Sequence, residues 1–107
     1  MTTASAITFQ FFRGDELLGT LVCSNSTLAT AWQGGVFEPA PGYERVRPLF
    51  DNELHLLKSG RMTEWKEMWE EIQRPGLRLE PAGGGEPKTG IVIHIENDQA
   101  WWKQAGS

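Results

Sequence analysis

The sequence predicts an α+β fold in which a mostly antiparallel sheet of about five strands forms two layers with a pair of helices. Near both ends of the chain, apolar and polar residues alternate, which is typical of half-buried strands. In the middle, apolar residues recur every three or four positions, which is typical of amphipathic helices. The expected order is two strands, two helices and three strands, and strand runs that flank helices favour the α+β class.

The chain is expected to begin with a β-hairpin made of residues 7–13 and 16–23. In the first segment, apolar side chains alternate with Thr8 and Gln10, and this period of two indicates a strand. The second segment is also apolar. Gly14 lies between the two segments, and glycine tolerates the positive φ that tight hairpin turns require.

Residues 24–42 are the longest expected connection. Residues 24–36 include no charged residue, and the following segment contains two prolines and a glycine. A loop of this length is uncommon in a compact domain, where it is usually functional or contains a short element. A short strand near residues 36–37 would account for it.

Two helices are expected at residues 43–59 and 63–74. In the first, only Glu53 interrupts the apolar stripe, and Pro48 is tolerated if it lies in the first helical turn. Gly60 suits the left-handed conformation that often follows a helix. The second helix carries a complete apolar stripe made of Trp65, Met68, Trp69 and Ile72.

Three short strands are expected after the helices, at residues 77–80, 91–96 and 99–103. Residues 81–90 are rich in glycine and indicate a turn. Isoleucine occupies every second position of the segment 91–96. Because the segment 99–103 is the last strand, we expect it at a sheet edge, where Lys103 alone would guard against unwanted pairing.

The length of 107 residues suits one domain that spans residues 1–107. Ten basic and fourteen acidic residues give a net charge of −4. Nucleic-acid binding and attachment to an anionic membrane are therefore not expected, because both require a basic surface. No apolar run approaches the roughly 20 residues of a membrane span. With one cysteine and no secretory signal, the expected location is the cytoplasm.

Residues that could carry chemistry are few and scattered. His55, His94 and Cys23 lack the short spacing of zinc ligands, so neither a metal nor another cofactor is expected. Cys23 and His94 could form a nucleophilic pair only if the fold brought them together, and a structural cysteine is the favoured interpretation. The glycines at 83–85 precede a strand rather than a helix, which favours a flexible turn over a phosphate loop. No catalytic residue is expected, and the sequence favours a protein that is not an enzyme.

Tryptophan is the compositional exception, with five residues in 107. Trp65 and Trp69 belong to the helical stripe, whereas Trp101 and Trp102 are neighbours on a strand and must point to opposite faces. Trp32 lies in the uncharged segment. Because tryptophan is enriched at interface hot spots, Trp32, Trp101 and Trp102 are the candidate contact residues.

We expect either Trp101 or Trp102 to lie outside the core and to contribute to association, unless residues 24–42 cover it. The leading hypothesis is a non-enzymatic interaction module that binds a protein partner or forms a homodimer. The alternative is a small-ligand-binding protein or minor enzyme, with a pocket between the sheet and the helices near residues 24–42.

Overall fold

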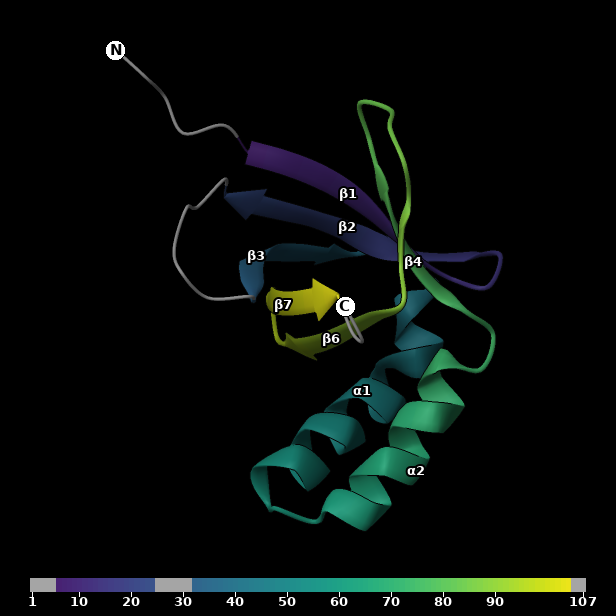
Figure 1. Cartoon of the computed structure of the whole chain (residues 1–107), viewed down its shortest axis with the longest axis vertical. Coiled ribbons are helices and arrows are strands. Elements are labelled where there is room, and N and C mark those ends of the chain that lie inside the picture. Colours follow the sequence, from purple (N-terminus) through teal and green to yellow (C-terminus); the bar gives the residue numbers. More distant parts are fainter. Residues whose placement is uncertain (1–5, 25–31, 105–107) are drawn as a thin grey trace.

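A computed structural model describes residues 6–24 and 32–104 of the chain, and Figure 1 shows the whole molecule. In chain order the elements are β1 (Ala6–Arg13), β2 (Glu16–Ser24), β3 (Gln33–Pro39), α1 (Tyr43–Lys58), α2 (Met62–Gln73), β4 (Leu77–Pro81), β5 (Lys88–Thr89), β6 (Ile91–Glu96) and β7 (Gln99–Gln104). The predicted α+β class, with an antiparallel sheet and a helical pair, is confirmed.

The sheet has seven strands rather than the expected five, in the order β5-β4-β1-β2-β3-β7-β6. One additional strand, β3, extends over seven residues of the segment expected to be mainly a loop. The other is β5, two residues at the end of the glycine-rich turn that pair with β4. All pairings are antiparallel.

The sheet curls so that its two edges approach each other. The edge strands β5 and β6 lie at opposite ends of the strand order, yet Gly90 alone separates them along the chain. Gly90 has a φ of +61°, a conformation that side chains rarely adopt. Gln104 Nε2 on β7 also donates a hydrogen bond of 3.1 Å to the carbonyl of Thr89 on β5. The curl gives the sheet an inner face that encloses the core.

The strand β7 lies between β3 and β6, so the expectation that it forms a sheet edge is wrong. The physical reason is the pairing of β3, whose residues from Gln33 to Val36 bond to the free side of β7. The short segment Gln33–Pro39 therefore shields the last strand from outside pairing.

The helices pack against each other, and α1 also lies against β6 (Figure 1). Trp69 and Ile72 of the predicted stripe are buried, and Trp65 and Met68 pack partly buried against the core, as expected. The helix α1 begins at Tyr43, so Pro48 lies in its second turn rather than its first. The aromatic contacts of the Tyr43 ring with Phe37 and Phe50 hold this early turn in place.

The core lies on the inner face of the sheet. There, Phe9 contacts Trp102 edge to face at 5.7 Å, and Phe11 contacts Phe50 of α1 at 6.1 Å. A Cβ atom on Gly19 would lie 2.6 Å from the Phe37 ring, so glycine is needed for this close approach.

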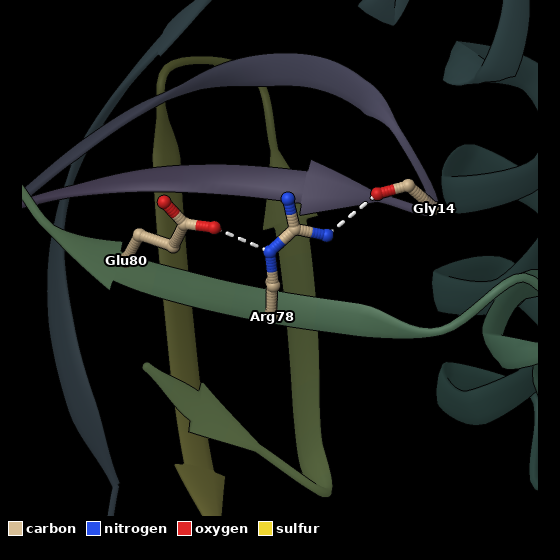
Figure 2. Close-up of polar contacts among 3 residues, drawn as sticks. All are labelled: Gly14, Arg78 and Glu80. Carbon is tan, nitrogen blue, oxygen red and sulfur yellow. Dashed lines mark hydrogen bonds and ion pairs between the residues drawn. The ribbon is translucent and has the colours of Figure 1, made fainter. Parts of the chain in front are cut away.

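An arginine fastens β4 to the first hairpin. Arg78 donates through Nε to Glu80 and through Nη1 to the carbonyl of Gly14 at 2.6 Å (Figure 2). Its guanidinium also lies 4.3 Å from the centre of the Phe12 ring. Because these contacts occupy the guanidinium, Arg78 serves the fold rather than a free binding surface.

Candidate functional site

The candidate tryptophans are distributed over both faces of the sheet. Trp102 points into the core and is 4% exposed, whereas Trp101 points to the outer face and is partly exposed. The expectation that one of the two lies outside the core is therefore confirmed, and that residue is Trp101. Its role in association remains a prediction. Of the segment expected to cover it, residues 25–31 lie outside the described residues.

The fold brings Trp32 and Trp101 together around His94. The Trp32 ring lies 5.3 Å from the His94 ring at an angle of 31°, and the Trp101 ring lies 5.7 Å from it. Lys103 Nζ lies 5.0 Å from the centre of the Trp32 ring, a cation–π distance. His94 lies on β6, Trp101 and Lys103 lie on β7, and Trp32 immediately precedes β3, which pairs with β7. Trp102 does not take part.

Beside these rings lies a buried polar cluster formed by Glu53, Trp65 and His94. Glu53 on α1 is 0% exposed and His94 on β6 is 3% exposed. Glu53 Oε2 accepts a hydrogen bond of 2.6 Å from Trp65 Nε1 on α2. His94 Nδ1 lies 2.8 Å from the same oxygen, which is an ion-pair distance. One carboxylate oxygen therefore joins both helices to the sheet.

Two buried polar atoms of this cluster lack a hydrogen bond. Among the described residues, Glu53 Oε1 has no hydrogen-bond partner, and His94 Nδ1 approaches Oε2 outside hydrogen-bond geometry. A buried charge without compensation is costly, and a close opposite charge offsets much of that cost. The contact of Glu53 with His94 and Trp65 is thus what makes a carboxylate tolerable inside this fold.

Cys23 and His94 do not meet. Cys23 lies on the inner face of β2, His94 lies on the outer face of β6, and β3 and β7 separate the two strands. Burial raises the pKa of the Cys23 thiol above its ordinary value. The fold therefore keeps the thiol protonated and unreactive, so the nucleophilic pair is ruled out and Cys23 is structural.

Between Glu38 on β3 and Lys103 on β7, the outer face of the sheet carries no charged side chain on β1, β2, β3 and β7. Its side chains alternate with the buried residues of β1, β2, β3 and β7. We call the following residues the neutral outer face: Thr8, Gln10, Thr20, Val22, Gly34, Val36, Gln99 and Trp101. Val36 is the most prominent apolar side chain of this surface, at 48% exposed.

A cavity of about 360 Å³ opens where the two edges of the sheet approach each other. Its lining comes from the end of α2, the start of β4 and the junction of β5 and β6, and it includes none of residues 32–42. This is not where the sequence places a ligand pocket. Over the described ranges, no three His, Cys, Asp or Glu side chains gather as metal ligands would.

Sequence reasoning missed the buried polar cluster. The available signal was Glu53, a charged residue on an otherwise apolar helical stripe. From the sequence alone, Glu53 only interrupts the apolar stripe of the helix. Its role becomes clear from its partners Trp65 and His94, which lie later in the chain.

Comparisons with known proteins identify no relative of this chain. A scan against protein families, a search of curated proteins and a search of solved structures each find no match. Within the described ranges, neither helix has the length and apolar character needed to cross a membrane.

Proposed function

We propose that this protein is a non-enzymatic interaction module of the cytoplasm that pairs with a second copy of itself through the neutral outer face. The observation that carries the proposal is the composition of this surface. Outward positions of a solvated antiparallel sheet are commonly polar and often charged, yet eight such positions on four strands carry no charge here. Two copies of a chain with a net charge of −4 can meet on this surface without bringing like charges together.

Charges at the two ends of the neutral outer face support a symmetric pairing. Glu38 lies at one end of the surface on β3, and Lys103 lies at the other end on β7, level with Trp32. Six residues separate these positions, or about 20 Å at roughly 3.4 Å per residue. When two copies stack with their strands reversed, Glu38 faces Lys103 of the partner subunit at both ends. A two-fold axis produces this self-complementary arrangement.

The size of the surface indicates a weak dimer. Four strands at a spacing of about 4.8 Å and a length of about 20 Å cover roughly 400 Å². A standard stable interface buries about 800 Å² on each partner. We therefore expect association that depends on concentration, rather than a permanent dimer.

Sedimentation velocity at protein concentrations from about 10 µM to about 1 mM, which brackets micromolar to millimolar dissociation constants, tests the proposal. The natural chain should shift from monomer to dimer, whereas Val36→Lys should remain monomeric. The side chain of Val36 is exposed, so this change should leave the folded monomer intact. Met62→Lys is the matched control, because Met62 is similarly exposed, at 52%, but lies on α2 away from the surface.

Two results would contradict the proposal. The first is a natural chain that stays monomeric over the whole concentration range. The second is equal loss of dimer in Val36→Lys and Met62→Lys, which would show that added charge, and not this surface, governs association.

A further inference from the structure

Gly34 on β3 lies within the neutral outer face, and the fold itself does not require a glycine there. The residue is exposed. A Cβ atom on Gly34 would lie 3.7 Å from the carbonyl oxygen of Ala100 and 3.9 Å from the Cβ of Trp101, which are ordinary contact distances. At Gly35, by contrast, a Cβ would lie 2.0 Å from the carbonyl oxygen of Val22. The monomer therefore has room for a side chain at Gly34 but not at Gly35.

A glycine inside a strand is unfavourable, because it has no side chain to pack and loses much conformational freedom on folding. Such a glycine often marks a bulge or a close approach of another molecule. The pairing of β3 with β7 is continuous from Gln33 to Val36, so no bulge accounts for Gly34. Nor is Gly34 among the glycines with a positive φ, so its backbone conformation is open to other residues. These observations favour a close approach from outside the monomer.

The missing side chain leaves a space beside Trp101, which we call the Gly34 notch. Trp101 is the cross-strand neighbour of Gly34 on one side and of His94 on the other. Its ring lies 5.7 Å from the His94 ring, and no atom of this ring lies within 4 Å of the Cβ position of Gly34. The notch therefore has the backbone of β3 as its floor and Trp101 at one side, and the indole ring does not fill it.

The proposed two-fold pairing determines what fills the Gly34 notch. Val36 lies two residues from Glu38 at one end of the surface. Gly34 lies two residues from Trp32, which is level with Lys103 at the other end. The reversal that places Glu38 against Lys103 of the partner subunit therefore also places Gly34 against Val36 of the partner subunit. We infer that the Gly34 notch is the socket for Val36 of the partner subunit, an inference that rests on the proposed function.

The chemistry of Val36 suits this socket. Its side chain is apolar, compact and 48% exposed in the monomer. Sheets that pack face to face lie about 10 Å apart, so the side chains of both faces must share the space between them. A glycine opposite the valine leaves the room that this side chain needs, and the neighbouring Trp101 offers it an apolar contact. A two-fold axis forms the contact twice.

Gly34→Val should have opposite effects on the monomer and on the dimer. Valine favours strands and glycine weakens them, so the Tm of a dilute sample should rise by about 2–8 °C. The added side chain fills the notch, so the dissociation constant of the dimer, measured by sedimentation velocity, should increase at least about tenfold. Gly83→Val is the matched control and should leave dimerisation unchanged. Gly83 lies in the turn between β4 and β5, and no described atom lies within 4 Å of its Cβ position.

Exchanging the two side chains provides a second measurement. Val36→Gly alone removes the side chain that enters the socket and should weaken the dimer. Combined with Gly34→Val, it moves the socket to position 36 and the projecting side chain to position 34, so dimerisation should recover. A double variant that dimerises no better than Gly34→Val would contradict the contact between these two positions.

Three other results would overturn the inference. A Gly34→Val variant that does not fold, or that melts below the natural chain, would show that the monomer itself needs this glycine. If Gly34→Val dimerises as well as the natural chain while Val36→Lys stays monomeric, the proposed function stands and the Gly34 notch is not the socket. If the natural chain does not dimerise, the proposed function fails and the socket fails with it.

Discussion

Replacing Trp65 with Phe tests whether the buried polar cluster stabilises the fold. The substitution keeps an aromatic ring on the α2 stripe but removes the indole N–H that donates to Glu53 Oε2 at 2.6 Å. Hydrogen bonds to charged groups contribute about 1.5–3 kcal/mol, and the acceptor here is fully buried. We therefore expect a loss of about 2 kcal/mol in the free energy of unfolding, which lowers the Tm of a domain of this size by about 8–16 °C.

The loss of ring volume also destabilises, so the hydrogen bond must be isolated by a double-mutant cycle with Glu53→Leu. Urea unfolding of the natural chain, both single variants and the double variant gives the coupling between the two positions. We expect a coupling free energy of about 2 kcal/mol. A coupling below about 0.5 kcal/mol is within the additivity of independent sites and would refute the view that Glu53 and Trp65 act together.

Three further predictions concern the core. Trp102→Ala should destabilise the protein by about 3–5 kcal/mol, as for other buried aromatic residues. Trp101→Ala should destabilise it clearly less, because Trp101 lies outside the core. The Tm values of the two variants in thermal unfolding test this difference. Gly19→Ala should destabilise by more than 1 kcal/mol, roughly the cost of overpacking, since its Cβ would lie 2.6 Å from the Phe37 ring; urea unfolding measures it. Because burial raises the pKa of Cys23, the folded protein should react with a thiol reagent at pH 8 no faster than it unfolds, and rapid labelling would contradict this placement.

The sequence was sufficient for the elements with strong local patterns. Alternation in the first hairpin and in residues 91–96, and the complete stripe of α2, correctly predict strands and a helix. The opposite orientation of Trp101 and Trp102 follows from strand geometry alone. These features depend on neighbouring residues, so no knowledge of the remainder of the chain is needed.

The rest depends on contacts between distant residues. Gly34 and Gly35 favour a loop locally, but in β3 a side chain at Gly35 would collide with the backbone of Val22, at 2.0 Å from its carbonyl oxygen. The glycine is thus required by strand packing that the local pattern does not reveal. Glu53 is similar, because its partners Trp65 and His94 become apparent only when α1, α2 and β6 are assembled.

Reversing the charges at the two ends of the neutral outer face tests the proposed dimer most directly. Glu38→Lys and Lys103→Glu should each weaken dimerisation, because each change places two like charges together at both ends of a two-fold interface. The double variant should recover dimerisation, since it exchanges the two charges and restores opposite pairs. Sedimentation velocity at low salt, where surface charges are least screened, measures all four proteins. Recovery in the double variant is the expected result, and a double variant weaker than either single variant would contradict the pairing of Glu38 with Lys103 of the partner subunit.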